Sequence, residues 1–178
     1  YEMRSLDRAG LMKLDVLGLR TVTVLQKAER MVVESGCDDF SLDSIPLDDP
    51  ETLALIRSGE TTGVFQLEGS GMREALRKIG VNRFEDVTAA VAIFRPGSMH
   101  MIDTYAQNKQ GMEAGNGFRI SYLHPELEDV LSETYGVMIY QEQVMAIAHR
   151  LSGMTMSEAD VFRKAISKKN AAIMARQR

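Results

Sequence analysis

Residues 10–18 read Gly-Leu-Met-Lys-Leu-Asp-Val-Leu-Gly, a short apolar run that contains one basic and one acidic side chain. Successive side chains of a β-strand point to opposite faces of the sheet, so the run predicts a strand over residues 10–17. The apolar side chains would share the buried face, and Lys13 and Asp15 would lie together on the other face. We expect Gly18 to end the strand.

The pair formed by Lys13 and Asp15 has two interpretations. A carboxylate suits a hard cation such as magnesium, and a lysine ammonium suits a phosphate as a point charge. On one strand face, the two side chains could therefore meet a metal ion and a phosphate together. The same spacing also fits an ion pair on a surface strand, and the spacing alone favours that plainer interpretation.

Outward from this run, the sequence is dominated by helical patterns with apolar residues three and four apart. Asp49 suits an N-cap, Pro50 suits the first helical position, and Gly59 suits the end of the same helix. Helices are expected over residues 19–34, 50–58, 70–79, 84–94, 99–109, 124–132 and 141–151, and after a cap at Ser157. An extended piece at 61–67 and a strand at 136–140 complete an α+β fold that is mainly helical.

Composition limits the class of protein. The chain has 178 residues, 44% hydrophobic and 26% charged, with a net charge of -4, which suits a packed core without an overall basic coat. The single cysteine, Cys37, excludes an internal disulfide and fits a reducing cytoplasm. No apolar run is long enough to span a membrane, and no signal peptide opens the chain. The chain begins at Tyr1 without Met, and we expect it to be an excerpt of a longer protein.

A basic run closes the sequence. From Val161 onward there are six basic residues and no acidic residue, and Lys164 and Lys168 lie one helical turn apart. Such a run can bind phosphates, although a solvated helix face has the same pattern. Arg95 precedes Pro96-Gly97, a tight turn that could aim its guanidinium, although such an arginine more often only satisfies nearby carbonyl groups.

Other chemistries have no support. The histidines do not fall at metal-ligand spacing with carboxylates, so we assign them no metal role. The sequence contains no Walker phosphate loop, no dinucleotide-binding glycine pattern and no nucleophile elbow.

Several motifs, taken in order, resemble the alpha subunit of bacterial DNA polymerase III, the C-family replicase. They cover nearly the whole chain. The motifs are Gly10-Leu-Met-Lys13-Leu-Asp15-Val-Leu-Gly18-Leu-Arg20-Thr21, Thr61-Thr-Gly-Val-Phe-Gln-Leu-Glu68, Arg83-Phe-Glu-Asp86, Phe94-Arg-Pro-Gly97, Tyr122-Leu-His-Pro125, Thr134-Tyr-Gly-Val137, Tyr140-Gln-Glu-Gln-Val144, Ala159-Asp-Val-Phe-Arg-Lys-Ala165 and Lys168-Lys169.

This resemblance implies an enzyme of template-directed DNA synthesis whose palm domain is of the polymerase-beta nucleotidyltransferase type. That palm carries three catalytic aspartates, and Asp15 corresponds to the third, as a ligand of a two-magnesium site. The other two would lie upstream of Tyr1. Residues 1–20 would then be the C-terminal part of the palm and residues 21–178 part of a helical fingers domain.

The resemblance also implies the binding residues. Lys13, Arg95, Arg163 and Lys164 would contact the incoming nucleotide. Lys168 and Lys169 would contact DNA.

Some residues depart from the family pattern. Lys164 stands where the family usually has a second arginine. A lysine keeps the positive charge but lacks the planar guanidinium that can donate two parallel hydrogen bonds. Val16 replaces a usual Phe, and Ser98-Met-His-Met101 replaces a usually longer segment. These changes suggest a divergent branch and put the processivity partners in doubt.

The implied partners are primer-template DNA, deoxynucleoside triphosphates, and a sliding clamp with other replisome subunits bound through other regions. The piece alone is expected to be an inactive part of a DNA-directed DNA polymerase. Two alternatives stay open at this point. One is a non-catalytic nucleic-acid-binding module that uses the basic C-terminal run. The other is a relic that kept the fold and lost the chemistry.

Overall fold

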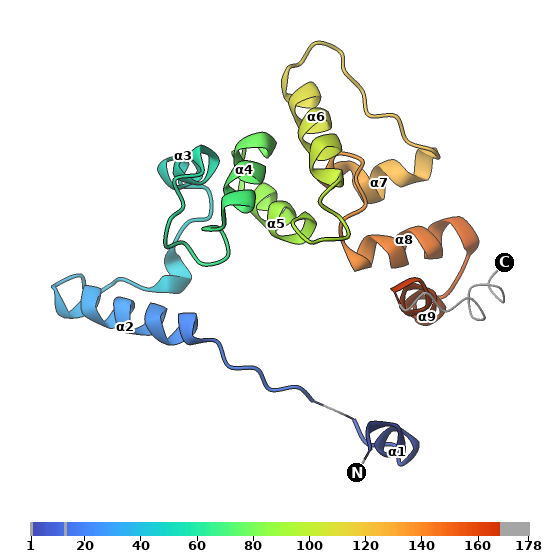
Figure 1. The fold of residues 1–178 in the computed structure, drawn as a ribbon, viewed down its shortest axis with the longest axis horizontal. Helices are drawn as coiled ribbons and strands as arrows, with labels where there is room; N and C mark the ends of the chain where they lie inside the picture. Colours follow the sequence, from blue (N-terminus) through green and yellow to red (C-terminus); the bar gives the residue numbers. More distant parts are fainter. Residues whose placement is uncertain (1, 13, 168–178) are drawn as a thin grey trace. The chain divides into compact units, whose positions relative to one another are not determined.

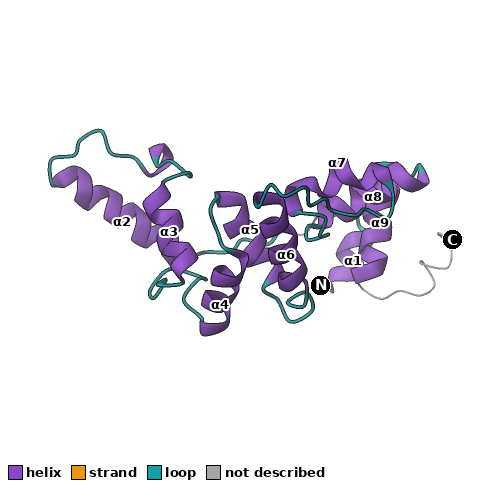
Figure 2. Ribbon diagram, turned by 90° about the horizontal axis from the view of Figure 1, so that it is seen from above, coloured by secondary structure: helices purple, strands orange, loops and turns teal. Residues whose placement is uncertain are grey.

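The computed structural model describes residues 2–12 and 14–167, and this part of the chain is helical (Figure 1). Figure 2 shows helices joined by loops, with no strand among the described residues. The chain divides into two compact units, Tyr1–Pro46 and Leu47–Arg178. The mainly helical prediction is therefore confirmed, and the residues that the structure describes form none of the predicted strands.

The first unit contains α1 (Met3–Arg8), α2 (Arg20–Glu34) and the short 3-10 helix η1 (Leu42–Ser44). None of the residues of α2 is fully buried. Its Glu29 carboxylate accepts a hydrogen bond from the backbone N–H of Leu42, at 2.9 Å between the heavy atoms. This bond attaches the end of the unit to the middle of α2.

The predicted strand over residues 10–17 is wrong for this chain. Its described residues lie outside any helix or strand, and Leu14 and Val16 are 76% and 95% exposed. A strand requires a neighbour for its backbone N–H and C=O groups. The described residues of this run are not assigned to a β-ladder, so alternation of apolar side chains was not sufficient to form a strand.

The second unit contains the remaining helices. They are α3 (Pro50–Ser58), α4 (Ser70–Ile79), α5 (Phe84–Ile93), α6 (Met101–Glu113), η2 (Pro125–Leu127), α7 (Glu128–Leu131), η3 (Ser132–Thr134), α8 (Gln141–Ser152) and α9 (Met156–Ser167). The caps of α3 confirm the prediction. Asp49 accepts a hydrogen bond from the backbone N–H of Thr52 at 2.8 Å, and Gly59 ends the helix in the left-handed conformation.

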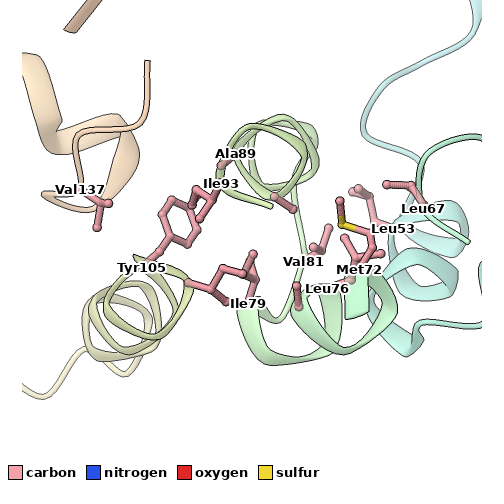
Figure 3. Close-up of a cluster of buried hydrophobic side chains, with 13 residues drawn as sticks. Leu53, Leu67, Met72, Leu76, Ile79, Val81, Ala89, Ile93, Tyr105 and Val137 are labelled. Carbon is pink, nitrogen blue, oxygen red and sulfur yellow. The ribbon is translucent and has the colours of Figure 1, made fainter. Parts of the chain in front are cut away.

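The core of this unit lies between α4, α5 and α6 (Figure 3). Leu76 and Ile79 of α4, Ile93 of α5 and Tyr105 of α6 are fully buried there. Burial of each large apolar side chain contributes about 1.5–3 kcal/mol, so this cluster fixes how the three helices pack. Val137, from the segment before α8, joins the same cluster.

Side chains satisfy the backbone where two extended segments were predicted. At 61–67 the chain forms turns instead, closed by a 2.6 Å hydrogen bond from the Thr61 hydroxyl to the carbonyl of Leu67. At 136–140 the Gln143 side-chain oxygen accepts the backbone N–H groups of Ile139 and Tyr140, at 2.8 and 2.9 Å. These segments therefore need no partner strand.

Helix α6 runs four residues beyond its predicted end, to Glu113, and so includes Gly111. The missing side chain of Gly111 matters here, because a Cβ atom would lie 2.7 Å from the ring of Phe118. A Cβ on Gly136 would likewise lie 2.6 Å from Ile120. The loop between α6 and η2 therefore packs on the unit through side chains that rest directly on glycine backbone.

Candidate functional site

Helix α9 presents two of the predicted nucleotide-binding residues, Arg163 and Lys164. The helix begins at Met156, and its cap Thr155 lies two residues before the predicted cap Ser157. Thr155 and Glu158 form a capping box, in which the Thr155 N–H donates to Glu158 at 2.8 Å and the Glu158 N–H donates to the Thr155 hydroxyl at 3.3 Å. Ser157 is therefore inside the first turn, and its predicted role was wrong.

Asp160 joins the two cations. Its Oδ1 atom lies 2.7 Å from Nη2 of Arg163, and its Oδ2 atom lies 2.6 Å from Nζ of Lys164. The hydrogen bonds from Lys164 and then from Arg163 hold the pKa of Asp160 below its usual value. The carboxylate therefore remains ionised and offsets the repulsion between the two adjacent cations.

A second contact fixes the guanidinium of Arg163. Its Nη1 donates a short hydrogen bond to the side-chain oxygen of Gln141, in the first turn of α8. The Arg163 side chain is only 18% exposed, whereas Lys164 is 58% exposed. Arg163 is therefore held in one orientation, and Lys164 is the more accessible charge.

The residues around this pair include two that the sequence prediction missed. Asp160 precedes Arg163 and Lys164 by three and four positions, the spacing at which helical side chains meet, so it could have been found. Gln141 lies on another helix and carried no comparable signal.

Arg95 lies on the turn after α5 and is exposed. Its carbonyl accepts the backbone N–H groups of Ser98 and Met99, at 2.9 and 3.1 Å, which closes a tight turn as the Pro-Gly sequence predicted. The ring of Phe94 lies against Gly71 of α4, where a Cβ atom would be 2.9 Å away. The turn is thus anchored on α4. The structure does not place Arg95 among the side chains that contact Arg163, namely Asp160 and Gln141.

The remaining predicted site residues lie in the first unit or outside the described residues. Asp15 is exposed and lies in the segment that leads to α2. Lys13, Lys168 and Lys169 lie outside the described residues. Their predicted roles in nucleotide and DNA binding stay predictions.

The described residues do not by themselves form a magnesium site. Within residues 2–12 and 14–167, no three His, Cys, Asp or Glu side chains are grouped so that they could hold a metal ion. Asp15 offers one carboxylate, which is fewer protein ligands than a stable two-metal site uses. A complete site would require carboxylates from elsewhere.

An apolar hollow beside α9 does not suit a nucleotide. It has a volume of about 350 Å³ and lies between α8 and α9, lined by Met138, Val144, Ile147, Leu151, Phe162 and Ile166 among others. Neither Arg163 nor Lys164 lines it. A triphosphate needs cationic or N–H donors, and on this helix those donors lie beside Asp160 and not in the hollow.

None of the helices in the described part of the chain is both long enough and apolar enough to cross a membrane.

Comparison with known proteins agrees with the motifs. The family model described as the bacterial DNA polymerase III alpha subunit finger domain matches residues 21–178. The chain is 45% identical over 175 residues to the DNA polymerase III subunit alpha of Halalkalibacterium halodurans, which covers 98% of the chain and 15% of that relative. It is 46% identical over 180 residues to the same subunit of Aquifex aeolicus, which covers 100% of the chain and 15% of that relative.

A third relative, the DNA polymerase III subunit alpha of Thermus aquaticus, is 42% identical over 178 residues, with 100% and 15% coverage. The chain therefore spans about 15% of the length of these relatives. The resemblance inferred from the motifs is confirmed, and the match extends through α9 and its cation pair. The chain belongs to the bacterial DNA polymerase III alpha subunit family, and its residues 21–178 match the finger domain of that family.

Proposed function

We propose that this chain is part of the catalytic subunit of a replicative DNA polymerase of the cytoplasm. In that subunit, it would help to transfer nucleotides from deoxynucleoside triphosphates to a primer 3′ end on a DNA template. The observation that carries the proposal is the Arg163–Lys164 pair, held by Asp160 on a helix of the matched finger domain. The proposal applies to the whole polymerase, because the chain spans about 15% of its relatives.

Phosphoryl transfer depends mainly on positioning and on neutralising charge, so cations that hold the triphosphate dominate its binding. Arg163 supplies a planar fork that suits two phosphate oxygens, and Lys164 supplies an exposed point charge. Asp160 keeps both cations in place before the nucleotide arrives. We expect the phosphates to take over part of the neutralising role of Asp160.

The first unit would supply a different part of the site. We propose that residues 1–20 belong to the palm domain, of polymerase-beta type, and that residues 21–178 belong to the fingers. In the complete palm sheet, residues 10–17 would pair with neighbouring strands of the palm. Asp15 would then provide one ligand for magnesium, which lowers the pKa of the primer hydroxyl and neutralises charge on the phosphates. Lys13 would contact the triphosphate.

We propose that further residues and regions contact the partners of the enzyme. Arg95 would meet the nucleotide, and Lys168 and Lys169 would meet the DNA backbone. A sliding clamp and further replisome subunits would bind through other regions. We also propose that the piece alone is inactive, since its described residues offer no cluster of metal ligands.

Substitution of Arg163 tests the nucleotide site. In the full-length polymerase, Arg163→Ala should raise the apparent KM for nucleotide by about 10- to 100-fold, since a hydrogen bond to a charged group contributes roughly 1.5–3 kcal/mol. Steady-state extension of a primed template over a range of nucleotide concentrations measures this.

Arg150→Ala is the matched control for this experiment. Arg150 lies on α8 and forms an exposed ion pair with Asp129 at 2.7 Å. The Arg150→Ala substitution therefore removes the same charge as Arg163→Ala but leaves the contacts of Arg163 intact. Surface ion pairs contribute about 0–1 kcal/mol, and the control should leave KM nearly unchanged. Equal KM values for Arg163→Ala and the unmodified enzyme would remove Arg163 from the nucleotide site.

A further inference from the structure

A polar cluster inside the second unit has no part in the proposed chemistry. The side chains of Asp86 on α5 and Lys109 on α6 are fully buried, with Oδ2 of Asp86 3.3 Å from Nζ of Lys109. Oδ1 of Asp86 accepts the hydroxyl of Tyr105 at 3.0 Å. Burial, and then the charge of Asp86, raise the pKa of Tyr105, so its hydroxyl stays a donor. The cluster therefore presents a fixed carboxylate in the first turn of α5.

Arg83 connects this carboxylate to a distant segment. Its Nε lies 3.3 Å from Oδ1 of Asp86, and its Nη2 donates to the carbonyl of Glu133 at 2.9 Å. The guanidinium carbon also lies 5.0 Å from the centre of the Tyr135 ring, which is a cation–π distance. Asp86 thus aims Arg83 at the turn between η3 and α8.

That turn has an uncommon backbone. Tyr135 has φ 51°, in the left-handed region that bulky side chains rarely adopt. Its ring stands edge-on to the ring of Tyr105, at 5.2 Å between centroids and 89° between planes. Its carbonyl accepts a hydrogen bond from the Asn108 side chain at 2.8 Å. Contacts with α5 and α6 therefore hold a turn that its own backbone preferences oppose.

The turn is tied directly to α8. The hydroxyl of Thr134 donates to the carbonyl of Val137 at 2.6 Å and accepts a hydrogen bond from the side chain of Gln143 at 2.8 Å. Gln143 lies in the first turn of α8, together with Gln141, whose side chain bonds Arg163. A chain of contacts therefore runs from Asp86 and Arg83 through the turn and the first turn of α8 to the guanidinium of Arg163.

We propose that Arg83 is a positioning residue for nucleotide binding: it holds the Tyr135 turn and, through the first turn of α8, sets the orientation of Arg163. This inference rests on the proposed role of Arg163. A bidentate contact with phosphate requires a fixed guanidinium plane, and a displacement of about 1 Å can lower catalytic efficiency about a hundredfold. Arg83 itself need not touch the nucleotide.

A double-mutant cycle in the full-length polymerase tests the coupling. The unmodified enzyme, Arg83→Ala, Arg163→Ala and the double variant are compared for nucleotide KM and kcat on primed DNA. We expect Arg83→Ala alone to raise KM about fivefold, with kcat within about twofold, and to add nothing in the Arg163→Ala background, because the two residues act as one unit. Additive effects on KM would overturn the inference.

Arg83→Lys separates positioning from simple stabilisation. Lysine keeps a cation beside Asp86, but it lacks the fork that bonds Asp86 and the Glu133 carbonyl together. We expect this variant to recover the Tm lost in Arg83→Ala while its KM stays raised. Recovery of both quantities would show that the charge alone matters and would overturn the positioning role.

Hydrogen–deuterium exchange supplies a readout that does not depend on activity. In Arg83→Ala, amides of residues 135–152 should exchange faster, while those of α4 stay protected. Unchanged exchange in α8 would overturn the inference even if activity fell. If Arg163→Ala left KM unchanged, the nucleotide site itself would be wrong, and exchange alone would decide whether Arg83 holds the turn.

Discussion

Asp15→Asn in the full-length polymerase should abolish primer extension. The amide has nearly the shape of the carboxylate, but it carries no negative charge for a magnesium ion. Metal stabilisation of the transition state contributes several kcal/mol, so its loss corresponds to a rate reduction of about a thousandfold or more. Single-nucleotide extension of a labelled primer measures this rate directly.

Asp38→Asn is the matched control, because Asp38 is also an exposed aspartate of the first unit, in the loop after α2. It should extend the primer at the normal rate. Circular dichroism of Asp15→Asn should be unchanged, since an exposed side chain contributes little to folding. Normal extension by Asp15→Asn would exclude this residue as a metal ligand.

The second large effect concerns stability. Asp86→Ala removes the acceptor for Tyr105, Arg83 and the backbone N–H of Asn82, and it leaves Lys109 buried with less neutralising charge. Breaking a buried ion pair in this way costs about 3–5 kcal/mol of the free energy of unfolding. Urea denaturation followed by circular dichroism measures the loss.

Two further variants test whether the buried charge causes this loss of stability. Asp103→Ala removes an exposed partner of Lys78, at 2.5 Å, and should change stability by about 0–1 kcal/mol. Replacing Asp86 and Lys109 together by apolar residues should cost less than Asp86→Ala alone, because no unpaired charge stays buried. A double variant that is no more stable than Asp86→Ala would show that packing, not charge, dominates at this position.

Local chemistry in the sequence predicted most helices. Helical spacing, with a side-chain cap at Asp49 and terminal glycines such as Gly59 and Gly80, gave α3 and α4 within a residue or two. The strand predictions failed because a strand depends on hydrogen bonds to another segment. At 136–140, Gln143 supplies those bonds from within the same local structure.

The candidate site was predictable only where its residues lie close together in the sequence. Arg163 and Lys164 stood out as neighbouring cations in one segment. The Asp86–Lys109 pair did not, because its members lie on different helices and meet only when α5 packs near α6. Tyr135 gave no signal either, since nothing in a Thr-Tyr-Gly sequence indicates a left-handed tyrosine held by Arg83.

The burial of Lys109 also governs its chemical reactivity. Its Nζ is fully covered and bonded to the carbonyl of Gly80 at 2.7 Å, whereas Lys27, Lys78 and Lys164 are exposed. An amine-acylating reagent should therefore label those three lysines in the native protein and reach Lys109 only when the helices around it separate. Peptide mass spectrometry at this one amine would record how often the core opens.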